Sequence, residues 1–549
     1  MPGFSSTPCW EKKLKSKKMI KDRVVGMVLP REKQTVLDWV DDNEKRLSDF
    51  HQLIWNYAEP AWREYKSAKA YVELLRKEGF NVVEGTGEMP TAFMATYGSG
   101  KPVIASYAEY DAVPGNSQKP EPFKAPRDGL HPWAAGHTDP HSALGVSALA
   151  GVLAAKEAME RHGLKGTLKF FGEPAEKVCG SKPVHAAKGY FDDFDASICY
   201  HPSGYNTCNW ETHSGAYWSV VFTFECVEPE KWFKPVHPGR IGGHAGGRCP
   251  ATIDAVCLMY TTTKYTKEAM LPHSGYWTLN EYIMTAGQCT SDNLPPRISQ
   301  IQYAWRVPTL EMAQRIYEVL ENNARHVAEI TFCRLSIRWV TKTRVGLPNR
   351  TMADITFRNL EAVGPPVYGE EAKRVGREIQ RSLGLEPMDD PFTEQCQRLT
   401  PPQEYESMQR RLLEPWQMHF GADDYVEYTW HAPSVRLYTA KAVLKPVPGY
   451  AYPAWASNAM GGIRSTIDPS FLVAGKAIGL TMVDLLTGPE ILAKAKEEFD
   501  ERTGGGVGGS RWVAPLLPKD FHPPVDLRWP EYVLTPRGEE WTLPTPKWG

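Results

Sequence analysis

Acidic and imidazole side chains follow four predicted strands in the first part of the chain. In open parallel sheets, ligands bind at the carboxyl ends of the strands, so these side chains are expected to gather at one edge. They are the types that bind Zn²⁺ or Mn²⁺, and a free carboxylate beside a metal ion can deprotonate its water. The pattern favours a metallohydrolase over a non-catalytic α/β protein. The residues are Glu109 and Asp111 in AEYDAVPG, His137, Asp139 and His141 in AAGHTDPHS, Glu173 and Glu176 in GEPAEK, and His201 in CYHPSG.

The elements that must position these residues alternate between strands and helices. FMATYG, VIASYAEYD, TLKFFGE and DASICYHP have the continuous apolar character of buried strands. Between them, the apolar pattern predicts a long helix from His141 to His162, ending at Gly163. Alternation of this kind is typical of a mostly parallel sheet covered by helices, so the predicted fold class is α/β.

The pattern changes after His201. YWSVVFTFECVE, RISQIQYAWRV and FCRLSIRWVTKTRV read as longer strands with one solvated face, and helices are predicted at 251–270 and 309–328. This order indicates a smaller α+β domain inserted into the first, and a helix at 469–486 then closes the α/β domain. The predicted organisation is an N-terminal tail at 1–30, a catalytic domain at 31–206 and 347–502, an inserted domain at 207–346 and an extended C-terminal tail at 503–549.

Composition excludes several classes of function. The formal net charge is −2 and the apolar content 42%, so nothing argues for nucleic acid or an anionic membrane surface as a partner. No apolar run approaches the roughly 20 residues that span a bilayer. The ten cysteines are scattered and form no CxxC pair, which fits a reduced cytoplasmic chain.

Several motifs occur together in one order along the chain. On these motifs the sequence resembles the metal-dependent aminoacylase, peptidase and amidohydrolase superfamily, in its aminobenzoyl-glutamate hydrolase-like branch. The resemblance implies a catalytic α/β domain and an inserted α+β lid domain that makes a homodimer or a higher homo-oligomer. The motifs are GKPVIASYAEYDAVPGNSQ, AGHTDPHSALG, KGTLKFFGEPAEKVCGSK, GYFDDFDASICYHP, GGHAGG with TIDAVCLMY, LPNR and DDYVEYTW.

The resemblance also implies catalytic and substrate-binding roles. Glu176 matches the general base, which takes a proton from metal-bound water and passes it to the leaving nitrogen. His244 matches a lid histidine that reaches a neighbouring subunit's site and stabilises the developing oxyanion. Asn293 and Arg306 resemble lid residues that orient the substrate, and an arginine suits a carboxylate.

For the metal, the resemblance assigns His137 and His201 as ligands and Asp111 as the acid that supports the site from behind. Three expected ligands are missing: Ala135 replaces a cysteine, Lys177 replaces a second glutamate, and a late histidine has no counterpart. A lysine cation repels a second metal ion. The expectation is therefore one divalent ion, Mn²⁺ or Zn²⁺, rather than two.

Three residues near the missing ligands are candidates to replace them, namely Glu173, Asp139 and His141. Two of them also have a simpler interpretation. Asp139 can cap the helix that starts near His141. Glu173 can form an ion pair with Lys177. The sequence leaves both alternatives open.

The predicted function is metal-dependent hydrolysis of a carbon–nitrogen bond, with Glu176 as the base. The predicted substrate is a small molecule, an N-acyl amino acid or an aminobenzoyl-type amide that carries a carboxylate and an aromatic ring. One alternative is hydrolytic deamination of an aromatic amine such as a nitroanthranilate. The other is a non-catalytic binding protein on the same fold.

Overall fold

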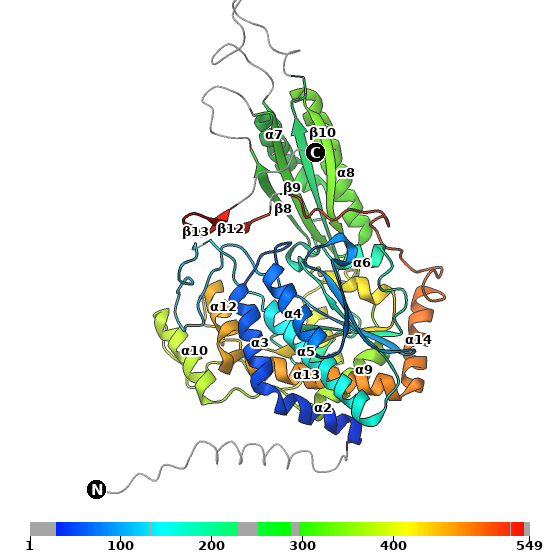
Figure 1. Ribbon diagram of the computed structural model, residues 1–549. Helices are drawn as coiled ribbons and strands as arrows, with labels where there is room; N and C mark the ends of the chain where they lie inside the picture. The colour runs from blue at the N-terminus through cyan, green and yellow to red at the C-terminus, as the bar shows by residue number, and fades with distance from the viewer. Residues whose placement is uncertain (1–28, 132, 229–250, 287–295, 528, 543–549) are drawn as a thin grey trace, which may run out of the picture.

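The computed structural model describes residues 29–131, 133–228, 251–286, 296–527 and 529–542. Two sheets organise these residues, a larger one in the body and a smaller one that projects from it (Figure 1). The N-terminal tail predicted at 1–30 falls almost wholly outside the described residues, as do His244 and Asn293.

The larger sheet has seven strands in the order β1-β2-β4-β3-β5-β11-β6. Its central strands β4, β3, β5 and β11 run parallel, whereas β1, β2 and β6 pair antiparallel at the two sides. The mainly parallel α/β fold predicted from the sequence is therefore confirmed. The strands are β1 Asn81–Glu84, β2 Phe93–Ser99, β3 Val103–Ala108, β4 Gly166–Gly172, β5 Ala196–Ser203, β6 Thr207–Cys208 and β11 Ser434–Ala440.

Helices cover this sheet, and two of them form the centre of the core. α5 (His141–His162) is the helix predicted from the sequence, and it ends at the left-handed Gly163. α13 (Arg464–Thr487) begins earlier than the predicted 469–486, with Pro469 inside it. The other helices of the body are α2 Arg31–Asp42, α3 Glu44–Tyr57, α4 Tyr65–Lys77, α6 Lys182–Ala187, α9 Arg350–Val363, α10 Glu370–Ser382, α11 Pro402–Arg410, α12 Ala454–Gly462 and α14 Pro489–Thr503.

By length and composition alone, α5 and α13 could each cross a membrane. In the folded protein, 89% of the most apolar window of α5 and 67% of that of α13 are buried. Both helices pack against each other and against the sheet, as core helices do.

The smaller sheet has the order β10-β7-β9-β8, and every neighbouring pair is antiparallel. Its apolar side packs on α7 and α8 around a separate core that includes Phe222, Trp305 and Leu320. This lid stands above the body in Figure 1. Its elements are β7 Ala216–Glu225, α7 Thr252–Thr266, β8 Thr278–Thr285, β9 Ile298–Val307, α8 Leu310–Thr331 and β10 Arg334–Lys342.

The C-terminal segment lies where the lid meets the body (Figure 1). Leu527 and Trp529 are buried in a small apolar cluster with Trp62 of the body and Val340 of the lid. Asp526 pairs with Arg338 of β10 at 2.6 Å. The segment then ends in a hairpin of β12 (Glu531–Thr535) and β13 (Gly538–Thr542).

Candidate metal and catalytic centre

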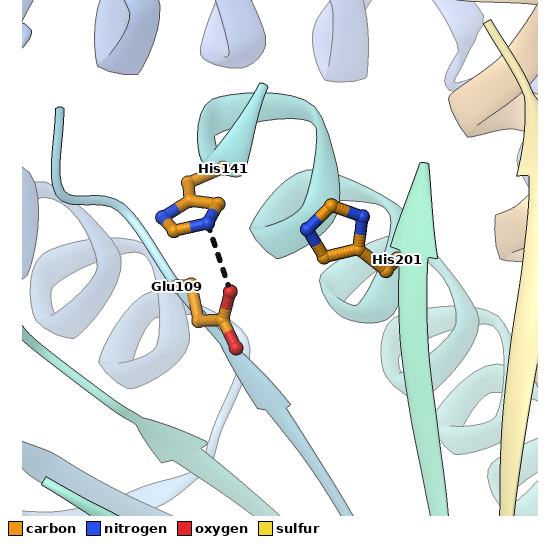
Figure 2. Close-up of side chains that lie close together, drawn as sticks. All are labelled: Glu109, His141 and His201. Atoms are coloured by element: carbon orange, nitrogen blue, oxygen red, sulfur yellow. Dashed lines mark ion pairs between the residues drawn. The ribbon is translucent and has the colours of Figure 1, made fainter. Parts of the chain in front are cut away.

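The strand ends of the larger sheet bring five polar side chains together. Glu109 follows β3, Glu176 and Lys177 follow β4 in a short 3₁₀ turn (Glu176–Val178), and His201 lies near the end of β5. His141, the first residue of α5, points between them, and Figure 2 shows it beside Glu109 and His201. The parallel topology thus brings Glu109, Glu176 and His201 together, as expected from the sequence. His141 does not follow a strand, contrary to the prediction, and reaches the group from the start of α5.

His141 is the side chain that connects the whole group. Its Nδ1 lies 2.7 Å from Oδ1 of Asp111, whose other oxygen accepts the backbone N–H of Lys177 at 2.8 Å. Its Nε2 lies 3.2 Å from Oε2 of Glu109 and 3.2 Å from Oε2 of Glu176. A carboxylate behind one ring nitrogen fixes the tautomer and leaves the other nitrogen available as a ligand.

Lys177 points its ammonium into this group. Nζ donates to Asp139 at 2.8 Å and to Glu176 at 3.2 Å, and it lies 2.9 Å from Nε2 of His141. Burial disfavours the ammonium, but Asp139 and Glu176 outweigh it and raise the pKa of Lys177. Burial likewise opposes ionisation of Glu176, yet Lys177 and His141 hold its pKa well below the ordinary range. We call Asp139, Glu176 and Lys177 the outer group.

The turn that carries Glu176 and Lys177 has an unusual backbone. Ala175 and Cys179, on either side of it, have left-handed φ angles of 58° and 49°. The buried carboxylate of Glu64 accepts the backbone N–H of Ala175 at 2.7 Å and so holds this conformation in place. Burial and the neighbouring Asp111 raise the pKa of Glu64 to about 8.

A second lysine lies deeper in the same site. Nζ of Lys182, on α6, donates to Oε1 of Glu109 at 2.7 Å and to Oδ1 of Asp424 at 2.5 Å. All three side chains are fully buried, and we call them the inner group. Burial raises the pKa of Asp424 well above its ordinary value, and so do Glu176 and Glu109, although Lys182 opposes this. One ammonium does not balance two buried carboxylates.

Arg436 of β11 extends the buried charges beyond the inner group. It pairs with Asp423 and donates to the hydroxyl of Tyr107 at 2.6 Å. The same Tyr107 ring lies under Lys182, 4.7 Å from Nζ to the ring centre. The sequence shows Lys182 and Arg436 only as isolated basic residues, so their burial could not be predicted from it.

The donor set fits one divalent ion. One ligand atom each from Glu109, His141 and His201 lies within 4.8 Å of the others. Among the described residues, Oε2 of Glu109 is buried and makes no hydrogen bond; it lies 3.2 Å from Nε2 of His141, so both atoms can turn to a shared cation. The other acidic group of this kind, Glu109 with Asp423 and Asp424, is already paired with Lys182 and Arg436.

The structure places some predicted ligands in this cluster and others apart from it. Asp139 lies 3.3 Å from Nε2 of His201. Glu173 is engaged elsewhere, by Nδ1 of His185 at 2.9 Å and the hydroxyl of Tyr428 at 2.9 Å, so it neither pairs with Lys177 nor reaches the cluster.

His137 is buried, and among the described residues neither ring nitrogen has a hydrogen-bond partner. Burial and the nearby His141 hold its pKa well below the ordinary value. It is absent from the groups whose ligand atoms converge. The histidine that joins Glu109 and His201 is His141 instead, four residues later, because it begins α5 at the sheet edge.

Arg306 approaches the cluster from the lid. It lies on β9, donates to the carbonyl oxygen of Ala422 at 3.2 Å, and its guanidinium lies 5.6 Å from the ring centre of Tyr217. Burial opposes its charge, but Cys179 and Glu176 raise the pKa of Arg306. A cation of the lid thus interacts electrostatically with Glu176 of the outer group.

A model of the peptidase family M20/M25/M40 matches residues 105–409, more than half of the 549 residues. The chain belongs to this family. It is therefore a metal-dependent hydrolase of carbon–nitrogen bonds, as the sequence predicted.

Two curated relatives of this chain cover most of the same region. One of the subunits of the p-aminobenzoyl-glutamate hydrolase from Escherichia coli is 29% identical over 346 residues, which cover 63% of this chain and 68% of the relative. Xaa-Arg dipeptidase from Mus musculus is 23% identical over 353 residues, which cover 62% of this chain and 73% of the dipeptidase.

Solved structures agree on the fold. A putative aminohydrolase from methicillin-resistant Staphylococcus aureus has a TM-score of 0.50 at 15% identity, covering 83% of this chain and 100% of that one. An aminobenzoyl-glutamate utilization protein from Klebsiella pneumoniae has a TM-score of 0.50 at 14% identity, and the match covers 83% of this chain and 99% of that one.

Proposed function

We propose that the protein hydrolyses the amide bond of an N-acyl amino acid or an aminobenzoyl-type amide, with Glu176 as the general base. The observation that carries the proposal is the position of Glu176. Its carboxylate lies 3.2 Å from His141, in the group that gathers Glu109 and His201. A base must be within reach of the proton it removes. This carboxylate lies beside a ligand set in which Oε2 of Glu109 is buried without a hydrogen-bond partner among the described residues.

Glu109, His141 and His201 would hold one divalent ion, Mn²⁺ or Zn²⁺. When bound, such an ion polarises the substrate carbonyl and lowers the pKa of a water molecule. Asp111 keeps His141 in the tautomer that presents Nε2, and Lys182 holds Glu109 so that Oε2 faces the two histidines. Asp139 is available from the side of His201.

In the metal-free protein, Lys177 and His141 outweigh burial and hold the pKa of Glu176 well below its ordinary value, so this carboxylate is ionised before an ion binds. It can therefore accept a proton from the attacking water as the water adds to the carbonyl carbon. It then delivers that proton to the amide nitrogen as the carbon–nitrogen bond breaks, so the products are a carboxylic acid and an amine.

The substrate end of the site accounts for a carboxylate and an aromatic ring. Arg306 offers a guanidinium to the carboxylate. Tyr217 lies under it, and Tyr276 contributes to its electrostatic environment. The ring of Tyr276 also lies 5.0 Å from that of Phe420, and both are partly exposed. These features, with the p-aminobenzoyl-glutamate named for the Escherichia coli relative, support an aromatic substrate that carries a carboxylate.

The same proposal includes a homodimer or higher homo-oligomer in the cytoplasm, in which His244 of one subunit reaches the site of another. Sedimentation of the purified protein tests the assembly. A His244→Ala variant mixed with a Glu176→Gln variant should regain activity if sites are shared between subunits. No recovery in the mixture would contradict the sharing.

Product analysis tests the reaction. The full-length protein is incubated with Mn²⁺ or Zn²⁺ and p-aminobenzoyl-glutamate, N-acetyl and N-benzoyl amino acids, and 5-nitroanthranilate. Release of an amino acid supports the proposal, whereas ammonia without an amino acid supports aromatic deamination. If none of these compounds is turned over and the protein binds no metal ion, the result supports a non-catalytic binding protein.

Glu176→Gln tests the base. Turnover should fall about 10²- to 10⁴-fold, the usual contribution of a positioned acid–base group, while the bound ion is kept. Glu160→Gln, an exposed acid on α5 paired with Tyr97, is the matched control and should be fully active. Full activity of Glu176→Gln would reject Glu176 as the base.

A further inference from the structure

We propose that the ammonium of Lys177 is a built-in cation of the site, which competes with the divalent ion for the same ligand atoms. The inference rests on the proposed metal site and adds a property to it. The site is neutralised from within when no ion is bound, and an ion enters only by displacing Lys177.

The contacts of Nζ are those of a bound cation. Three potential ligand atoms surround it, from Asp139 before α5, His141 in α5 and Glu176 in the turn after β4, at 2.8, 2.9 and 3.2 Å. A surface ion pair joins two side chains, but here one ammonium gathers three acceptors from two separate segments. The backbone N–H of the same residue is fixed by Asp111 at 2.8 Å, so the chain is anchored where Lys177 starts.

His141 makes the two cations mutually exclusive. In the neutral tautomer that donates Nδ1–H to Asp111, Nε2 carries a single lone pair. That nitrogen can accept a hydrogen bond from Lys177 or coordinate an ion shared with Glu109 and His201. The ammonium must therefore leave Nε2 before the ion binds.

Lys177 has a route for leaving. Its side chain is 21% exposed and that of Asp139 is 39% exposed, so the ammonium can swing toward solvent while its backbone stays in place. A lysine stem is flexible and its charge is strongly hydrated, which makes such an exchange accessible. Lys182 has no such route, because its side chain and both of its acceptors are fully buried.

Metal titration of Lys177→Met tests the competition. Metal-free full-length protein is titrated with MnCl₂ or ZnCl₂ in a calorimeter. Methionine keeps the length of the side chain and removes the charge, so the dissociation constant should fall about ten- to a hundredfold, the value of a charge-assisted hydrogen bond no longer broken on binding. Lys188→Met is the matched control, because Lys188 pairs with Glu88 at the surface, and its affinity should equal that of the wild type.

Lys177→Glu gives a second, independent result. It turns the cation into a ligand beside Asp139 and Glu176, and ion binding should again tighten, with one more ion per chain than in the wild type. Anomalous diffraction from Mn²⁺-soaked crystals locates the ions, and circular dichroism shows that each variant is folded.

The outcomes separate this inference from the proposed function. Equal or weaker ion binding in both Lys177→Met and Lys177→Glu overturns the competition, even if the wild type is an active metal enzyme. Wild type that binds no ion, with variants that do, upholds the competition and overturns the metal-dependent function. If Lys177→Met does not fold, Lys177→Glu decides.

Discussion

Lys177 and Lys182 lie in the same site, five positions apart in the chain, and each binds two carboxylates. The difference between them is burial. Lys182 and its partners are fully buried, whereas the side chains of Lys177 and Asp139 are 21% and 39% exposed. The inner group is therefore a fixed part of the fold, and the outer group can exchange its partners with solvent. The same residue type serves as a scaffold in one place and as an exchangeable charge in the other.

The contrast follows from the energetics of buried charge. Removing one partner of a buried pair leaves an uncompensated ion in a medium that solvates it poorly. An exposed partner is solvated by water when its pair is broken, so little is lost. Five substitutions follow in order of the expected effect, four of them within the two groups and one, Arg306→Met, in the lid.

Lys182→Met should give the largest effect. It leaves Glu109 buried without its ammonium partner and removes a hydrogen-bond donor from Asp424, and the free energy of unfolding should fall by about 3–5 kcal/mol. Lys177→Met, the matched substitution in the outer group, should lower it by less than about 1 kcal/mol. Urea denaturation of the metal-free proteins measures both values, and equal losses would remove the distinction between the groups.

Arg306→Met should lower activity without lowering stability. The guanidinium lies in the lid and is the group proposed to bind the substrate carboxylate, so its loss should reduce kcat/KM about ten- to a hundredfold for substrates that carry a carboxylate. Substrates in which that carboxylate is an amide should lose much less. Steady-state assays of the paired substrates measure the difference. A similar loss for both would show that Arg306 does not recognise the carboxylate.

Asp424→Asn tests the inner group through pH. The pKa of Asp424 is raised in the folded protein, so its folded state keeps the proton while the unfolded chain loses it from about pH 4 upward. Asp424 should make wild-type stability decline through that window by about 1.4 kcal/mol per pH unit. The asparagine variant should lose this contribution and keep the decline due to Glu64, whose pKa is raised to about 8. Denaturation of metal-free protein between pH 4 and pH 8 compares the slopes, and parallel curves would contradict the assignment.

Asp139→Asn should give the smallest effect, with the opposite pH dependence. The pKa of Asp139 is lowered because His201 and Lys177 outweigh burial, so its stabilisation is present above about pH 4 and is lost as pH falls through the lower folded-state pKa. Because the side chain is 39% exposed, the loss at pH 7 should be less than about 1 kcal/mol. This loss of stability should disappear at acidic pH, where the wild-type carboxylate is protonated as well. A loss that persists at pH 2 would arise from something other than its charge.

The fold was readable from the sequence because it depends on patterns that repeat. Continuous apolar strands and the helix from His141 to Gly163 carry the period of their secondary structure, and the family motifs occur in order. The strand-end positions of Glu176 and His201 follow from the same patterns.

The pairing inside the site was not readable in this way. Glu173 turns to His185, which follows it by 12 residues, whereas Glu109 meets Lys182 across 73. In the amino-acid sequence, a lysine in a polar stretch looks the same whether its side chain is solvated or buried in the fold. Only the close approach of β3, α6 and the segment at 423–430 buries Lys182, and no local pattern encodes that approach.

The place of β11 in the sheet sets the order in which these parts can be assembled. β11 pairs with β5 although the chain of the lid lies between them, whereas the lid sheet uses only residues 216–342. A growing chain can therefore complete the lid while the body sheet still lacks an interior strand. Asp424 and Arg436 arrive only with that late segment. Until then Lys182 has Glu109 as its carboxylate partner in this group, so the second buried carboxylate joins the inner group only as the last interior strand enters the sheet.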